Sequence, residues 1–324
     1  MATSMLSPLT AAIGPGQRQE DEDTGRVPLD AQCGHCDATD AAWPVRLAGG
    51  EGPLICVRCG GWLNSRGGTV DVCSVCALPR GFLGHGDKGC PVDESALERM
   101  AASPTEREEL GVRVFRAATE LYEPCQPNGL ERYVAGVFDK VGATGSAKIV
   151  FVDLGEPAVA LLPRGDLVLT LGLLAALEDE AQLAFVLARE VALDRSGWIW
   201  RRFGAASKRN RGWLRRLAFR SRNSLVEAVD LTFQMGYGPE AERAADRSAL
   251  ATLVHADYEP SSAVRALRLL EGAALAGTGG RFLLAADRAG WLEESALALG
   301  RTPNARLNRE VYRRAVDGFN VFGR

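Results

Sequence analysis

The stretch from Arg164 to Asp194 restricts the fold of this chain more than any other, because it joins a short apolar strand to a long apolar helix. Residues 167–171 read LVLTL, an apolar run of β character. After Gly172 the pattern becomes helical, and three acids at 178–180 stand where a helix start favours negative charge. The stretch therefore predicts a strand, a turn and a long buried helix, in that order.

Two separated blocks of the sequence carry a family resemblance. The first block, 157–193, reads PAVALLPRGDLVLTLGLLAALEDEAQLAFVLAREVAL. The second contains ERAAD at 242–246 and ADYEP at 256–260, which fit the patterns Glu-x-x-Ala-Asp and Ala-Gly-Tyr-Asp-Pro. In this order the blocks resemble the zinc endopeptidases related to the bacterial membrane protease HtpX and the CAAX prenyl endopeptidase, the gluzincin-type metallopeptidase family 48. The resemblance covers roughly residues 105–320 and implies a zincin-like fold.

The resemblance also implies roles for residues on two helices. In the family, the first helix carries His-Glu-x-x-His, whose histidines bind zinc, and the second supplies a glutamate as third ligand. The histidine positions here hold Arg189 and Leu193. The catalytic glutamate is retained as Glu190, and the third ligand as Glu242, with Asp246 one turn further on. Leucine has no ligand atom and arginine stays protonated, so we expect a degenerate site without catalytic zinc.

Arg189 is expected to take over the role of the cation at this site. Carboxylates gathered in a partly buried site repel one another and take up protons unless a cation is present. A guanidinium stays charged and can hold two carboxylate oxygens at once. We therefore expect Arg189 to join the two helices by neutralising nearby acids, which are Glu190, Glu242 or Asp246.

Composition places the chain among ordinary globular proteins, since its 324 residues are 46% hydrophobic and 24% charged. No apolar run approaches the roughly 18 residues that would suggest a membrane span. The amino-terminal stretch lacks the basic start and long apolar core of a signal peptide. We therefore expect a cytoplasmic location, with peripheral attachment to a membrane as the alternative.

Cysteines near the amino terminus form a pattern of metal ligands. Six of the chain's eight cysteines come as three Cys-x-x-Cys pairs, and in a reducing compartment this spacing favours metal over disulfides. Two such pairs complete a tetrahedral thiolate shell that suits zinc. The first two pairs could share one ion and leave four ligands for a second, or the pairs could interleave. We expect one or two structural zinc ions, held by Cys33, Cys36, Cys56, Cys59, Cys73, Cys76, His85 and Cys90.

These patterns divide the chain into three segments. Residues 1–30 are rich in Gly, Pro and acids and predict a disordered tail, and residues 31–98 form a zinc-ribbon-like module. Residues 103–322 form the peptidase-like domain, which opens with a capping box, SPTE, at 103–106. Apolar residues recur at helical spacing through most of it. The predicted fold is α+β and mainly helical, with a small antiparallel sheet that includes 167–171.

A basic stretch at 195–222 is expected to be an insertion in the peptidase-like domain. It holds ten arginines and lysines and no acid, with tryptophans and other aromatic residues between them. This composition suits a helix on an anionic membrane surface and, less well, a nucleic-acid contact. The alternative is a solvated loop whose aromatic residues pack on the domain. The candidate anion-binding residues are Arg201, Arg202, Arg209, Arg211, Arg215 and Arg216.

The sequence leaves three hypotheses for function. The first is a degenerate peptidase homologue that binds or scaffolds a peptide or protein, with an extended peptide along a strand edge at 167–171. The second is an active hydrolase in which Mg²⁺ or Mn²⁺ is bound by four carboxylates, those of Glu190, Asp194, Glu242 and Asp246. The third is a protein that binds nucleic acid or a membrane surface through the zinc module and the basic stretch.

Overall fold

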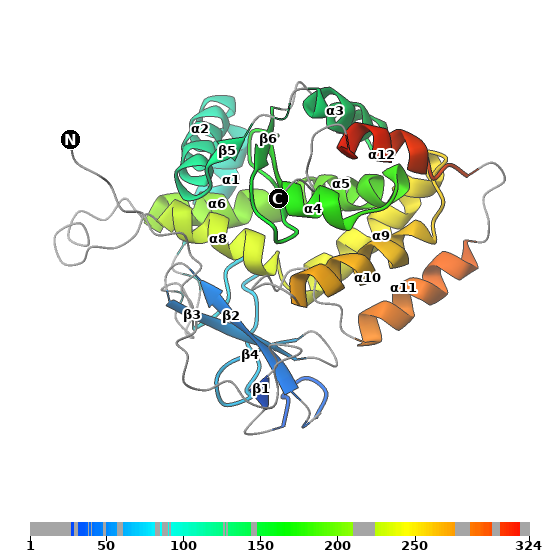
Figure 1. Ribbon diagram of the computed structural model, residues 1–324. Helices are drawn as coiled ribbons and strands as arrows, with labels where there is room; N and C mark the ends of the chain where they lie inside the picture. Colours follow the sequence, from blue (N-terminus) through cyan, green and yellow to red (C-terminus); the bar gives the residue numbers. More distant parts are fainter. Residues whose placement is uncertain are drawn as a thin grey trace, which may run out of the picture.

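Figure 1 shows the computed structural model of the 324-residue chain. The structure describes residues 27–28, 32–37, 39, 41–47, 50–56, 61–81, 85, 90, 92–125, 127, 129–143, 148–209, 224–275, 286–299 and 305–317. Within these ranges the fold is mainly helical with two small sheets, so the prediction of a mainly helical α+β fold is confirmed.

The first sheet belongs to the cysteine-rich module, which lies below the helices in Figure 1. It is antiparallel and follows chain order, with strands β1 (Val27–Pro28), β2 (Ala41–Leu47), β3 (Gly50–Cys56) and β4 (Trp62–Leu63). Strand β1 lies within the tail predicted to be disordered; the rest of that tail is outside the described residues. Helix α1 (Glu94–Ala102) follows the module.

The second sheet lies among the helices and corrects two predictions. Its strands are β5 (Pro124–Cys125), β6 (Ile149–Val152), β7 (Val159–Leu161) and β8 (Leu167–Thr170), in the spatial order β5-β6-β8-β7. Strand β8 lies between β6 and β7, and it pairs in parallel with β6 and in antiparallel with β7. The sheet is therefore mixed, and the predicted antiparallel sheet is wrong. The predicted edge strand at 167–171 is wrong as well, because β8 is internal.

The helices surround a long central helix, α5 (Glu180–Arg195), of whose 16 residues thirteen are buried. It packs along α9 (Pro239–His255) and α10 (Ser262–Leu275). This burial explains why apolar residues occur on every side of the helix rather than in one stripe. The remaining helices are α2 (Pro104–Leu121), α3 (Leu130–Lys140), α4 (Leu171–Ala176), α6 (Trp198–Arg209), α8 (Ser224–Met235), α11 (Ala286–Ala298) and α12 (Arg309–Asp317).

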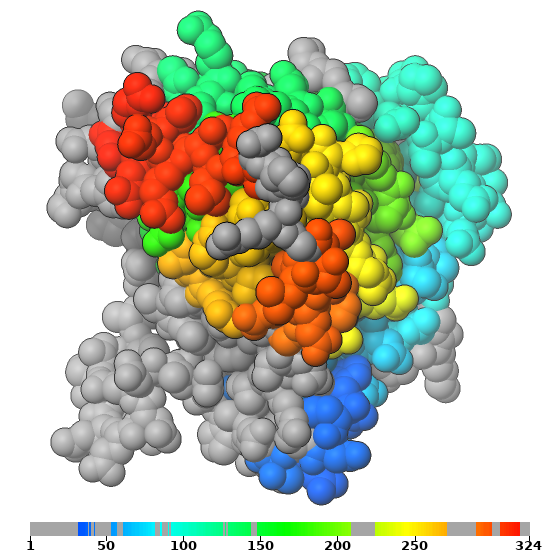
Figure 2. All heavy atoms as spheres, turned by 90° about the vertical axis from the view of Figure 1, so that its right-hand side faces the viewer, coloured from blue at the N-terminus to red at the C-terminus, as the bar shows by residue number. Residues whose placement is uncertain are grey.

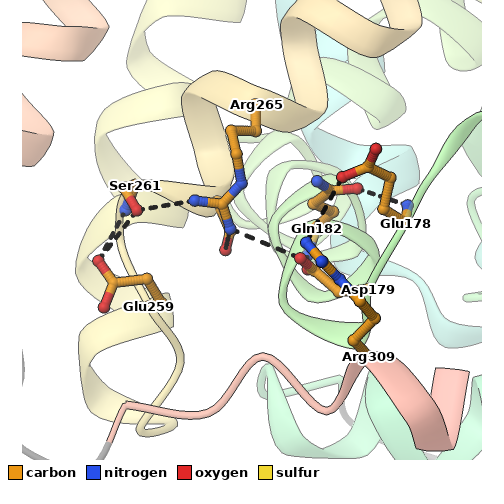
Figure 3. A network of polar contacts seen from close by, with 8 residues as sticks. Glu178, Asp179, Gln182, Glu259, Ser261, Arg265 and Arg309 are labelled. Carbon is orange, nitrogen blue, oxygen red and sulfur yellow. Dashed lines mark hydrogen bonds and ion pairs between the residues drawn. The ribbon is translucent and has the colours of Figure 1, made fainter.

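Polar contacts fix the start of α5, as Figure 3 shows. The Asp179 side chain accepts a hydrogen bond from the Gln182 backbone N–H at 2.9 Å, the usual bond of an N-cap residue. Arg265 of α10 lies 3.5 Å from Asp179, and Arg309 of α12 lies 3.7 Å from Glu178. Asp179 therefore caps α5. Asp179 and Glu178 also connect the start of α5 to α10 and α12.

Glu180, the first residue of α5, is a buried carboxylate with four side-chain donors. Tyr258 donates at 2.6 Å, Tyr133 and Asn308 at 2.9 Å, and Lys140 at 3.0 Å. Burial alone would raise the pKa of Glu180, but these hydrogen bonds to the charged form lower it. One carboxylate thus links α3, α5, the turn after α9 and the segment before α12.

Replacing Glu180 by glutamine removes the charge that these donors share. We expect the free energy of unfolding to fall by about 2 kcal/mol, the usual worth of a hydrogen bond to a charged group. Because folding lowers the pKa of Glu180, its stabilisation is complete above the unfolded-state pKa and is lost as the pH falls through the folded-state pKa. Urea unfolding of both proteins from about pH 7 to pH 3 measures the two effects.

The matched control is Glu178→Gln, since Glu178 is exposed and its contact with Arg309 is a surface ion pair. It should change the free energy of unfolding by less than about 1 kcal/mol. An equal loss in both variants, or a stability gap between Glu180→Gln and the natural protein that does not narrow with acid, would contradict the prediction.

Candidate functional site

A fully buried arginine joins α5 to α9. The guanidinium of Arg189 donates from Nε to Asp246 Oδ1 at 2.7 Å, and from Nη2 to Glu242 Oε2. Burial would lower the pKa of Arg189, but the charges of Asp246, Glu242 and Glu190 raise it above its ordinary value. The arginine is therefore charged, and the predicted ion pair between the two helices is confirmed.

Two further residues of α5, Glu190 and Leu193, also have structural roles. Glu190 is buried, and its Oε2 accepts a hydrogen bond from the Leu161 backbone N–H of β7 at 3.0 Å. Leu193 is fully buried in the hydrophobic core. With a guanidinium and a leucine at the positions where the resemblance implies histidine ligands, these residues do not fit a catalytic zinc.

The four-carboxylate site of the alternative hydrolase hypothesis is not formed. Among the described residues, two groups contain three or more potential metal ligands with donor atoms within 4.8 Å of one another. Both groups are rich in cysteine. Glu242 and Asp246 face Arg189, whereas Asp194 lies in the field of Arg107 and Arg195. Burial raises the pKa of Asp194 despite those two cations. The prediction that these acids gather around one ion is wrong, because Arg189 takes up two of them.

One cysteine-rich group is complete and consists of Cys73, Cys76, His85 and Cys90. The turn after Cys73 is closed by a hydrogen bond from Ala77 N to Cys73 O at 2.8 Å, and Ala77 lies in the left-handed region with φ 55°. Burial opposes ionisation of Cys73, but hydrogen bonds from the Cys76 backbone and the His85 side chain lower its pKa to about 7. Three sulfurs and one imidazole suit a tetrahedral structural zinc.

The other group contains Cys33, Cys36 and Cys56, with the Sγ atoms of Cys36 and Cys56 3.9 Å apart. Cys59, the predicted fourth ligand, lies outside the described residues. The Cys56 N–H donates to the Gly61 carbonyl oxygen at 2.9 Å. The first pair therefore lies beside Cys56, and the third pair joins His85 and Cys90, which decides against interleaved pairing among the described ligands. Both groups could hold a metal ion.

Arg202 of α6 connects the group of Cys73, Cys76, His85 and Cys90 to the helices. Its guanidinium donates to Ala77 O from Nη2 at 2.8 Å and from Nε at 3.1 Å, and its Nη1 donates to Thr232 Oγ1 at 3.2 Å and to Gly236 O. It also lies 4.1 Å from the centre of the Tyr237 ring. Because Arg202 is fully buried, its prediction as an anion-binding surface residue is wrong.

The rest of the predicted insertion is described only in part. Residues 198–209 form α6, which packs on the core through Ile199 and Phe203, and Arg201 lies 5.5 Å from the Trp198 ring centre. Trp200 is half-buried beneath Arg107, whose guanidinium lies 4.9 Å from its ring centre. The side chains of four candidates lie outside the described residues, so their anion binding stays a prediction: Arg209, Arg211, Arg215 and Arg216.

A cleft of about 740 Å³, which no sequence pattern predicted, lies between the cysteine-rich module and the start of α9. On the face shown in Figure 2, the blue and cyan surface of the module adjoins the yellow surface of α9. The walls of the cleft come from segments far apart in the chain, which is why local patterns gave no sign of it.

The burial of Arg202 did have a sequence signal, since Ile199, Arg202, Phe203 and Ala206 share one helix face.

Comparison with known proteins assigns no family: no protein-family model matches the chain, and no curated protein matches it. The resemblance to zinc endopeptidases therefore stays a prediction. Over the described ranges, no helix combines the length and apolar character needed to cross a lipid bilayer.

Replacing Arg189 by methionine should leave Glu242 and Asp246 as buried acids without their cation. We expect the free energy of unfolding to fall by about 3 to 5 kcal/mol, the usual cost of removing one partner of a buried pair. Adding Glu242→Gln and Asp246→Asn to Arg189→Met removes the uncompensated charge and should restore part of this loss. Urea unfolding of the single and combined variants measures both steps.

Arg268→Met is the matched control, because Arg268 is an exposed arginine of α10 that pairs with Glu293 at 2.9 Å. Its loss should stay below about 1 kcal/mol. A comparably small loss for Arg189→Met would show that the buried pair does not hold α5 against α9.

Metal removal should affect the two cysteine-rich groups differently. We expect two zinc ions per full-length chain, one in each group. Cys73→Ser should remove one ion and lower the melting temperature of the helices, because Arg202 binds the carbonyl next to that group. Cys33→Ser should remove the other ion with a smaller effect on the helices, since Cys33, Cys56 and Leu63 form a separate small core.

Elemental analysis after purification without chelator gives the metal content, and circular dichroism during heating follows the helices. One ion or fewer per natural chain would overturn the two-site prediction. Equal melting temperatures for the Cys33→Ser and Cys73→Ser variants would overturn the link through Arg202.

Proposed function

We propose that the chain is a non-catalytic homologue of the zinc endopeptidases it resembles and that it binds or scaffolds a peptide or protein. Structural zinc in the cysteine-rich module stabilises the module in this role. The observation that carries the proposal is the buried ion pair of Arg189 with Glu242 and Asp246. It puts a guanidinium at a position where the resemblance implies a metal ligand.

The chemistry of this pair supports binding without cleavage. Peptide hydrolysis by this class of enzyme needs a nucleophilic water, and bound zinc supplies it by lowering the water pKa from 15.7 to about 7. A guanidinium has no open coordination position and cannot bind water in this way. Glu190, at the general-base position, accepts the Leu161 N–H. Both residues therefore stabilise the fold where an active homologue would activate water.

The proposal predicts that the natural protein does not cleave casein or unstructured peptides. Restoring both ligands with Arg189→His and Leu193→His should add one zinc ion per chain to those of the module, since Glu242 can serve as third ligand. Arg189→His alone is the matched control, because it supplies only one of the two missing histidines. Elemental analysis and a fluorogenic peptide assay measure metal and activity on the same samples.

Glu190→Gln separates cleavage by this site from cleavage by a contaminating protease. Chelator-sensitive cleavage by the natural protein that disappears in Glu190→Gln would overturn the proposal. Circular dichroism of each variant confirms that it is folded, so that absent cleavage is not mistaken for a lost fold.

A further inference from the structure

The cleft between the module and α9 has the size and lining of a ligand site. Its volume of about 740 Å³ lies within the range of roughly 300 to 1,000 Å³ that small ligands occupy. The apolar part of its lining includes the buried residues Trp62, Val70, Tyr237 and Ala241. Trp198, at the start of α6, adds a half-buried aromatic ring. A ligand with apolar groups can therefore bury surface here.

One wall of the cleft carries two arginines of α9. Arg243 and Arg247 are one helical turn apart, so they lie on the same face of the helix. Within the described part of the chain, neither guanidinium has a carboxylate within 4.0 Å. Arg247 lies 5.8 Å from the ring centre of Trp291 on α11, which supports its side chain without neutralising it. Two cations without an ion-pair partner favour an anionic group in the cleft.

The remaining charges favour a peptide over a polyphosphate or a nucleic acid. Asp71 of the module and Glu240 at the start of α9 also line the cleft, and both are exposed. A ligand with several negative charges would bring some of them near these two carboxylates. A peptide with one acidic side chain can place that carboxylate at Arg243 and donate a neutral backbone N–H to Asp71 at the same time.

Close packing holds the base of the cleft in place. The Tyr237 N–H donates to Glu242 Oε1 at 2.9 Å, which connects the cleft to the buried ion pair. Gly238 has φ 100°, and a Cβ atom there would come within 2.6 Å of Val72 on the module. The module and the turn before α9 are therefore fitted to each other, which reduces the ordering that binding would require.

We propose that this cleft binds a short peptide segment through an acidic side chain held by Arg243 and Arg247, with apolar neighbours of that side chain packed on Trp62 and Trp198. The inference rests on the proposed function, and it adds the place of binding and the class of ligand.

The test uses the full-length, zinc-supplemented protein and fluorescein-labelled peptide mixtures of about six residues, a length that spans roughly 20 Å when extended. Two mixtures are identical except for a central glutamate or glutamine, and a third has a central lysine. We expect fluorescence anisotropy to show about tenfold tighter binding of the glutamate mixture than of the glutamine mixture, a difference that shrinks with added salt.

Charge variants in the cleft should change this preference in opposite directions. Arg243→Met and Arg247→Met should each lower the affinity for the glutamate mixture about tenfold, and Arg243→Glu should shift the preference toward lysine. Asp71→Asn should strengthen glutamate binding, since it removes a repelling carboxylate. Arg268→Met removes an exposed arginine outside the cleft and should leave binding unchanged.

Equal binding of the glutamate and glutamine mixtures would overturn the ligand class. Preference for glutamate that survives both Arg243→Met and Arg247→Met would overturn the site. Tripolyphosphate that competes as well as the glutamate peptides at equal ionic strength would replace the peptide by a phosphate ligand. Each of these results leaves the proposed binding function standing, whereas metal-dependent cleavage of the same peptides would overturn that function.

Discussion

The buried pairing of Arg189 with Glu242 and Asp246 is the interaction on which the helical part of the structure depends. Taking three charges out of water is costly, so the arrangement persists only because one guanidinium satisfies both carboxylates across the α5 and α9 interface. Glu242 also accepts the Tyr237 N–H through its second oxygen. The ion pair therefore fixes both the packing of α5 on α9 and the turn from which α9 begins.

A second buried arginine extends this connection to the cysteine-rich module. Arg202 contacts the Tyr237 ring on one side and binds Ala77 O, next to Cys76, on the other. A continuous series of contacts thus runs from the cysteine-rich group that contains Cys76 through Arg202, Tyr237 and Glu242 to Arg189. Because several apolar residues of the module belong to the same core as the helices, the two parts of the chain stabilise each other.

Local patterns predicted what local interactions determine. The N-cap of α5 and the capping box before α2, whose Ser103 accepts the Glu106 N–H at 3.3 Å, follow from neighbouring residues. Strand order does not, because the insertion of β8 between β6 and β7 is decided by packing across the sheet. The helix face of Arg202 indicated its burial, but its acceptor, the Ala77 carbonyl oxygen 125 residues earlier in the chain, could not be read from local pattern.

Glu190, at the position where the resemblance implies a general base, has a structural explanation that does not involve catalysis. Glu190 receives the Leu161 N–H at the outer strand β7, so its carboxylate pairs a backbone group that would otherwise be buried without an acceptor. Replacing it with an apolar residue would leave that N–H unsatisfied, at a cost of about 1 to 3 kcal/mol. The same argument applies to Arg189, because the buried carboxylates of Glu242 and Asp246 need a cation beside them to remain charged. The stability of the fold is therefore enough to explain the buried acids Glu190, Glu242 and Asp246, and the presence of Glu190 alone is no argument for hydrolysis.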